Sequence, residues 1–290
     1  MIVNHSKGEK VLYGINMLLL IMFALIAIVP FMTVIATSLS SKIAVDQNKV
    51  TLYPINFTLD TWKYILRRSD LWKSFFLTLA TTAIGTALGL LITSLFAYPL
   101  SKRDFKLSRL LMAATVITMI FKAPVVPFFL TVRSMGLIDN PLVLIIPHVL
   151  NAYSVAIMRT FFRQIPIELE ESAKIDGCGY FRLLFSIILP SSKAVLATIG
   201  LLYAVTIWNQ FNTPLLFIQN IKLFPLQMKV RQFIVQGSEM PNVLQQIKVN
   251  YNDRTIRAAT VVFTIIPIIA VYPYLQKYFV KGAMLGSVKG

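Results

Sequence analysis

Charged residues are scarce in this sequence, and acidic residues are the scarcest of them. Only 14% of the 290 residues are charged and 12 are acidic, whereas about a quarter of the residues in a typical soluble domain are charged. Hydrophobic residues make up 56% and gather in runs long enough to cross a hydrocarbon core of roughly 30 Å, which takes about 20 helical residues. The composition excludes an ordinary soluble domain and predicts an all-α integral membrane protein.

Residues for disulfide, metal or nucleotide chemistry are also nearly absent. The single cysteine, Cys178, excludes an intramolecular disulfide, and the two histidines, His5 and His148, lie far apart. The sequence contains neither an H-E-x-x-H motif nor the G-x-x-x-x-G-K-[ST] loop that binds nucleotide phosphates. We therefore expect no catalytic residue, metal site or cofactor in this chain. Any uphill transport needs energy from a partner chain or an ion gradient.

Apolar runs predict six transmembrane helices in a single domain that covers residues 1–290. The predicted spans are residues 11–39, 74–98, 107–131, 141–162, 194–217 and 258–279. Lys122, Pro124 and Pro127 interrupt the third span, and the sequence Asp139-Asn140-Pro141 supplies a cap residue and a first-turn proline for the fourth. An even number of spans places both termini on the same side of the membrane.

Basic residues indicate which side that is. The net charge of +16 is spread over every loop rather than along one stripe, so we assign it to span ends and anionic lipid and not to nucleic acid. Among the shortest loops, residues 99–109 contain four basic residues and residues 133–140 contain one. Because cytoplasmic loops are the more basic, the termini and loop 163–193 are predicted to be cytoplasmic and residues 218–257 to form an outer loop.

Four of the 12 acidic residues fall within nine positions, in a polar insert between the fourth and fifth spans. They are Glu168, Glu170, Glu171 and Asp176. Carboxylates in a first helical turn are stabilised by the helix dipole, and Glu170 and Lys174 are spaced for an ion pair. Gly177 suits the turn that ends a helix. We call residues 168–190 the acidic segment.

The second half of the acidic segment predicts another short helix along the same membrane face. Phe181, Leu184, Phe185 and Ile188 recur at helical spacing as one apolar stripe, and Pro190 ends this helix before the fifth span. A helix that rests on lipid headgroups is usually rich in Lys and Arg. An acidic helix at an anionic leaflet is better explained by a protein partner.

The pattern Glu171-Ser-Ala-x-x-Asp-Gly177, followed at matching offsets by Ile187 and Leu189-Pro190, resembles the EAA loop of ABC importer permeases. The family pattern reads Glu-Ala-Ala, two residues, Asp-Gly-Ala, then Phe, Ile and Leu-Pro. The departures, all small or apolar substitutions, are Ser172, Cys178 and Leu184. Residues 282–290 also resemble the maltose-type second permease subunit of the carbohydrate branch, and the resemblance covers essentially the whole chain.

The resemblance implies a type I ABC importer permease fold that forms half of a heterodimer in a bacterial cytoplasmic membrane. It implies four partners: a homologous permease subunit, a cytoplasmic ABC ATPase dimer that binds ATP and Mg, an extracytoplasmic solute-binding protein that meets the outer loop, and a sugar. In this family the loop fits a cleft in the ATPase. The residues expected to couple to the ATPase are Glu168, Glu170, Glu171, Asp176, Gly177 and Pro190.

Polar groups within the spans mark a candidate substrate path. Trp208-Asn-Gln-Phe-Asn212 begins about 15 residues beyond Lys193, and Lys122 lies about 13 beyond Arg109, so both sit roughly 20 Å along their spans. Such groups usually face a bundle interior or a water cavity, and planar polar and aromatic side chains suit a sugar. Lys122 would add a counter-charge for an acidic sugar. The predicted path residues are Lys122, Asn151, Tyr153, Trp208, Asn209, Gln210 and Asn212.

Other roles stay open for these residues. Trp208 suits an interfacial aromatic belt, Asn209 and Asn212 suit bonds between helices, and Lys122 suits a side chain that reaches outward.

The sequence thus predicts the permease subunit of an ATP-driven importer of sugars or oligosaccharides, including acidic, uronate-containing ones. The alternative cargo is a glycerol-phosphate-like or other anionic solute. A secondary transporter is disfavoured by the few intramembrane acids and the lack of an inverted repeat. An enzyme is disfavoured because the spans hold no carboxylate pair or metal-ligand set.

Overall fold

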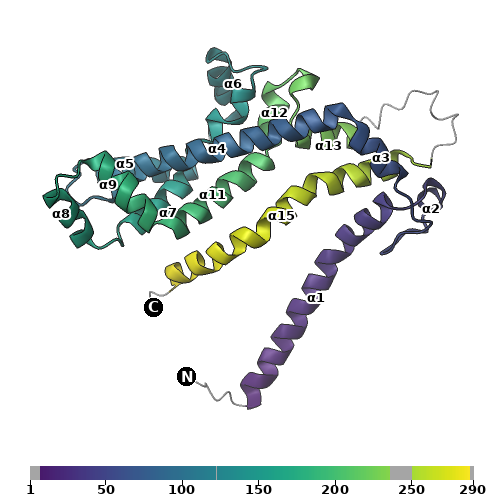
Figure 1. Ribbon diagram of the computed structural model, residues 1–290, viewed down its shortest axis with the longest axis horizontal. Helices are drawn as coiled ribbons and strands as arrows, with labels where there is room; N and C mark the ends of the chain where they lie inside the picture. The colour runs from purple at the N-terminus through teal and green to yellow at the C-terminus, as the bar shows by residue number, and fades with distance from the viewer. Residues whose placement is uncertain (1–6, 122, 236–249, 288–290) are drawn as a thin grey trace. The chain divides into compact units, whose positions relative to one another are not determined.

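The structure, a computed structural model, describes residues 7–121, 123–235 and 250–287 (Figure 1). All secondary structure within these ranges is helical. Three of the predicted spans coincide with single helices that are long and apolar enough to cross a membrane. These helices are α1 (Lys7–Ser38), α4 (Ser69–Ser101) and α15 (Asp253–Ser287).

The third predicted span is divided into two helices. α5 (Ser108–Ile120) ends before Pro124, and α6 (Val125–Ser134) begins after it. The break follows from the proline, which lacks an N–H and disfavours helical conformation in the residue before it. Pro127 lies in the first turn of α6, where a proline is tolerated, so it does not interrupt the helix.

The fourth predicted span is bent. Two 3-10 helices, η1 (Pro141–Leu144) and η2 (Ile146–His148), precede α7 (Ala152–Phe162), and the two halves meet at 47°. The Asn140 side chain accepts a hydrogen bond from the N–H of Leu142 at 2.9 Å, which confirms the predicted cap. The predicted helix start is therefore confirmed, although η1, the helix that begins there, is short.

The fifth predicted span also contains a break. α11 (Lys193–Trp208) is followed by α12 (Asn212–Phe217), so the polar residues between them lie where the helix is interrupted. Pro214 sits inside α12 and not at the break. The predicted outer loop 218–257 begins with η4 (Ile221–Leu223) and α13 (Leu226–Val235), and its residues 236–249 lie outside the described ranges.

The chain divides into two compact units, residues 1–69 with 230–266 and residues 70–229 with 267–290. In the first unit, α2 (Lys42–Asp46) and α3 (Asp60–Arg67) follow α1. Side-chain amide and guanidinium groups join this region to the start of α15: Asn252 donates to Asp46 at 2.6 Å and Arg254 to Asn48 at 2.7 Å. Among the residues that the structure describes, none in the apolar window of α1 is buried.

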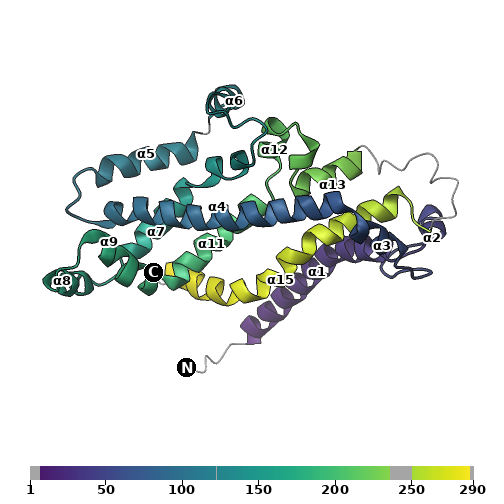
Figure 2. The same ribbon diagram turned by 45° about the horizontal axis from the view of Figure 1, so that its top comes forward.

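In the second unit, α7 and α11 run beside the long helix α4 (Figures 1 and 2). Glycine allows the close approach of α11: a Cβ at Gly89 would lie 3.1 Å from ring atoms of Tyr203. The hydroxyls of Tyr203 and Thr93 are 2.6 Å apart, and the Tyr203 hydroxyl also accepts the N–H of Asn151 at 3.0 Å. Tyr203 therefore ties α11 both to α4 and to the start of α7.

A hydrophobic core forms where these three helices meet the acidic segment. Leu183, Leu184 and Ile188 of the acidic segment are at most 2% exposed and pack in this core. Their partners from α4, α7 and α11 are Ala97, Tyr98, Leu100, Val155, Met158, Phe162, Val195, Ile199 and Tyr203. The core anchors the second half of the acidic segment to the transmembrane helices.

Candidate functional site

The first half of the acidic segment forms α8 (Ile167–Ile175), which begins directly after Pro166. It ends in a Schellman motif: the N–H of Gly177 bonds to the carbonyl of Lys174 at 3.0 Å, and the N–H of Cys178 to that of Ala173 at 2.9 Å. Gly177 has a φ of +77°, a conformation that favours glycine. The predicted sequence of short helix, glycine turn and second helix is thus present.

The acidic residues of α8 face two directions. Glu168, Glu171 and the C-cap residue Asp176 are exposed, whereas Glu170 is 6% exposed. Ile175 on the outer surface is 87% exposed. The outer surface of α8 combines three carboxylates with uncovered apolar side chains, a composition typical of a protein-binding surface.

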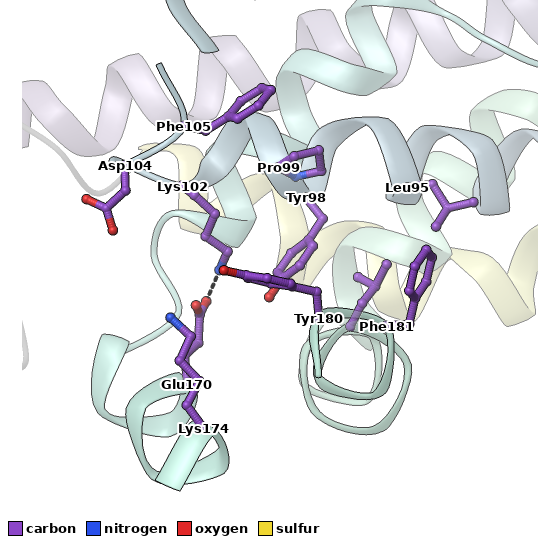
Figure 3. A pocket seen from close by; sticks show the side chains of 11 residues that line it. Leu95, Tyr98, Pro99, Lys102, Asp104, Phe105, Glu170, Lys174, Tyr180 and Phe181 are labelled. Carbon is purple, nitrogen blue, oxygen red and sulfur yellow. Dashed lines mark hydrogen bonds and ion pairs between the residues drawn. The ribbon is translucent and has the colours of Figure 1, made fainter. Parts of the chain in front are cut away.

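Glu170 connects α8 to the end of α4. Its carboxylate forms an ion pair with Lys102, whose ammonium lies 4.2 Å from the ring centroid of Tyr98 (Figure 3). Sequence spacing had predicted Lys174 as the partner. The observed partner, Lys102, lies one residue beyond the end of α4. It belongs to the 99–109 loop, whose basic residues predict the orientation of the chain in the membrane.

The second half of the acidic segment is helical but not uniform. α9 (Tyr180–Leu183) leads into a π-helical turn, η3 (Leu184–Ile188), and then into α10 (Leu189–Ser191). Leu184 and Ile188 are buried, while Phe181 and Phe185 are 73% and 45% exposed. The four residues of the predicted apolar stripe are therefore divided between the core and the surface, and a π turn replaces the regular α-helical spacing from Leu184 to Ile188. Pro190 is exposed within α10, and the chain bends by 87° before α11.

A cavity of about 650 Å³ separates α8 and α9 from the end of α4. Leu95, Tyr98 and Phe181 give it apolar walls, and Lys102 and Glu170 lie at its edge (Figure 3).

The Trp208–Asn212 cluster occupies the break between α11 and α12. Trp208 and Gln210 are buried, whereas Asn209 and Asn212 are exposed. Gln210 donates its amide N–H to the carbonyl of Leu144 at 3.1 Å. Within the described part of the chain, the Trp208 indole nitrogen and the Gln210 side-chain oxygen are buried without a hydrogen-bond partner.

The other predicted path residues lie elsewhere. Asn151 caps α7, accepting the N–H of Ser154 at 3.1 Å, and lines a cavity of about 200 Å³ with Tyr153 and Tyr203. The Trp208–Asn212 cluster does not line this cavity. Lys122 lies outside the described residues.

Local sequence patterns single out neither Lys102 nor Tyr203 as a site residue. Lys102 is one of four basic residues in the 99–109 loop, and Tyr203 lies within an apolar span. Tyrosine within a membrane helix was an available signal, because a buried Tyr hydroxyl usually finds a partner. No local pattern pointed to Lys102, since its partner is 68 residues away.

Residues 85–284 match the family described as "Binding-protein-dependent transport system inner membrane component". The chain belongs to this family. Among its relatives, the polygalacturonan/rhamnogalacturonan transport system permease protein YtcP of Bacillus subtilis (strain 168) is 41% identical over 97% of this chain and 98% of the relative. The melibiose/raffinose/stachyose import permease protein MelC of the same organism is 29% identical over 90% of this chain and 91% of the relative.

A solved structure resembles the permease along nearly its whole length. It is a chain of a bacterial ABC transporter involved in the import of the acidic polysaccharide alginate, with a TM-score of 0.89 and 32% identity. The match covers 95% of this permease and 99% of that chain. The predicted ABC importer permease fold is thereby confirmed.

Proposed function

We propose that this permease is one of the two membrane subunits of an ATP-driven importer of oligosaccharides derived from acidic polysaccharides. Two relatives with matches along nearly the whole chain support this cargo, since one is named for polygalacturonan and rhamnogalacturonan and the other for alginate. The partners would be a homologous permease, a cytoplasmic ATPase pair that binds ATP and Mg, and an extracytoplasmic solute-binding protein. Both termini and the acidic segment would be cytoplasmic.

The observation that carries the proposal is the construction of α8. Its outer surface presents Glu168, Glu171 and Asp176 to a partner, while its inner surface is held by Glu170 and by the core. A helix attached in this way can transmit movement of the partner to the end of α4. The second half of the acidic segment follows α8 and leads into the start of α11. Movement of α8 can therefore reach two transmembrane helices, α4 and α11.

The breaks in the helices support a substrate path near the Trp208–Asn212 cluster. Interrupted helices expose backbone and side-chain polar groups, which membrane proteins tolerate only where protein or water covers them. The unpartnered polar atoms of Trp208 and Gln210 mark such a place. Lys122 stays a candidate because the sequence places it at a similar depth.

Substitutions on α8 test the coupling. In the assembled transporter, Glu171→Lys and Gly177→Asp should leave the permease inserted but reduce co-purification of the ATPase and the ATP hydrolysis stimulated by the solute-binding protein. Glu171→Lys reverses an exposed charge, and Gly177→Asp places a side chain at a φ of +77°.

Matched controls are available close by. Asp104→Lys reverses an exposed charge on the loop after α4, and Gly179→Asp adds the same side chain where φ is negative and no atom lies within 4 Å of the new Cβ. Both controls should retain the ATPase. Wild-type coupling in Glu171→Lys and Gly177→Asp would contradict the assignment of α8.

The cargo is tested separately with the solute-binding protein of the same transporter. Calorimetric titration should give tighter binding of oligogalacturonides or alginate oligosaccharides than of neutral stachyose of similar length. Preference for the neutral sugar, or for glycerol phosphate, would overturn the cargo and leave the coupling mechanism intact.

A further inference from the structure

A basic groove lies beside α5 and shares Lys102 and Phe105 with the cavity described above. Its volume is about 800 Å³. Six cationic side chains line it: Lys102, Arg103, Lys106, Arg109, Arg159 and Arg163. The first four come from the loop after α4 and the start of α5, and the last two from the end of α7 and the residue after it.

The positive charge of this basic groove is largely uncompensated. Lys102 pairs with Glu170, but within the described residues no carboxylate lies within 4.0 Å of the other five cations. Arg159 and Arg163 each donate Nε to a carbonyl at the end of α4, at 2.9 Å to Leu100 and 3.4 Å to Ser101. These bonds hold both guanidinium groups near each other, one helical turn apart, where like charges repel.

The basic groove continues into an apolar wall. Met112, Ala113, Val116 and Ile117 line it along one side of α5. They begin one turn beyond Arg109 and recur at helical spacing, so the wall extends roughly 12 Å from Arg109 to Ile117 at about 1.5 Å per residue. Val116 and Ile117 are 41% and 55% exposed, and no part of the described chain covers them.

We propose that this groove binds an anionic phospholipid, with its phosphate against the cations and an acyl chain along α5. Because the cations and the apolar wall line the same groove, a lipid fits it better than a soluble anion does. A free phosphate would leave the apolar wall in contact with water. The groove also selects an anionic over a zwitterionic lipid, because choline would add positive charge to five uncompensated cations. Basic pockets between transmembrane helices at the cytoplasmic side bind headgroups in this way.

Lipid titration of the assembled, delipidated transporter tests the proposal. Native mass spectrometry would compare phosphatidylglycerol and phosphatidylcholine with identical acyl chains. Wild type should bind phosphatidylglycerol about 10-fold or more tightly, and Lys106→Gln with Arg109→Gln should remove most of that preference, given roughly a fivefold effect for each basic residue near a headgroup. Both residues are exposed, and neither makes a hydrogen bond or ion pair in the described part of the chain.

The control is Arg182→Gln with Lys193→Gln, which removes two exposed cations outside the basic groove and should keep the preference. Three results would overturn the proposal. They are equal binding of the two lipids by wild type, displacement of phosphatidylglycerol by millimolar inorganic phosphate, and loss of ATPase co-purification with unchanged lipid binding in Lys106→Gln with Arg109→Gln. The last result would assign the groove to the ATPase.

Discussion

Glu170 is the residue whose surroundings say most about how the acidic segment works. The helix dipole stabilises any carboxylate in the first turn of α8, whichever way its side chain is directed. The side chain of Glu170 is directed inward and forms an ion pair with Lys102. The pair is only partly shielded, since the side chains of Lys102 and Glu170 are 23% and 8% exposed. Its role is to hold α8 against the end of α4, while the other carboxylates stay available to a partner.

Removal of one member of this pair should therefore loosen α8. Glu170→Gln or Lys102→Met leaves a poorly hydrated charge, with a cost toward the lower end of about 3–5 kcal/mol because Lys102 reaches water. Limited proteolysis of the purified transporter should show faster cleavage within residues 163–193 than in wild type.

The control for this experiment is Lys174→Met, on the same helix as Glu170. Lys174 is exposed and is the partner that spacing alone would predict, so its loss should leave the cleavage rate unchanged. Faster cleavage in Lys174→Met than in Lys102→Met would show that the i,i+4 pair forms in the membrane and that the long-range pair does not.

At the scale of helices, the approach of α4 and α11 depends on the absence of a side chain at Gly89. The facing Tyr203 ring cannot move away easily, because its hydroxyl is bonded to Thr93 and to the N–H of Asn151. Small residues at helix crossings commonly permit such packing in membranes. The three helices α4, α7 and α11 thus act as one support for the acidic segment.

Gly89→Ala should lower the free energy of unfolding by about 1–3 kcal/mol through overpacking. A lower midpoint of thermal unfolding of the purified transporter would show it. Gly14→Ala is the matched change on α1, where no atom lies within 4 Å of the added Cβ, and it should leave the midpoint unchanged or raise it slightly. Equal midpoints for the two variants would mean that the Tyr203 ring moves away from the added methyl group without lowering the stability of the transporter.

The sequence predicted the helices well where a single local rule governs them. Long apolar runs gave α1, α4 and α15, Pro124 gave the break between α5 and α6, and Gly177 gave the turn after α8. Features that depend on contacts distant in the chain were not predictable in this way. The π turn after Leu183 packs into the core that α4, α7 and α11 build, and the Lys102–Glu170 pair joins residues that are 68 positions apart, so no local spacing encodes either feature.

At the scale of the whole molecule, the permease has two functional ends connected by shared helices. α11 begins beside the acidic segment and ends at the Trp208–Asn212 cluster, so one helix links the proposed ATPase contact to the proposed path. The two ends of α11 are 15 residues apart, or roughly 22 Å. Movement of α8 can reach the path through rigid displacement of this helix.

Substitutions at the path end should affect transport without affecting assembly. Asn209→Ala and Lys122→Met are expected to reduce uptake of the oligosaccharide several-fold, because each removes a polar group from the proposed path. Radiolabelled uptake into proteoliposomes measures this effect, and ATPase co-purification should equal that of wild type. Normal uptake in both variants would place the path elsewhere, with the cavity at Tyr153 and Tyr203 as the next region to test.

The Schellman turn that ends α8 has a practical consequence for spectroscopy. Its last hydrogen bond comes from Cys178, which is half-buried and is the only thiol of the chain. A natural sequence with one cysteine, placed beside the glycine that sets the geometry of the turn, needs no engineering before a fluorophore or spin label is attached. A reporter at this position would follow changes around the turn that ends α8, the helix proposed to contact the ATPase.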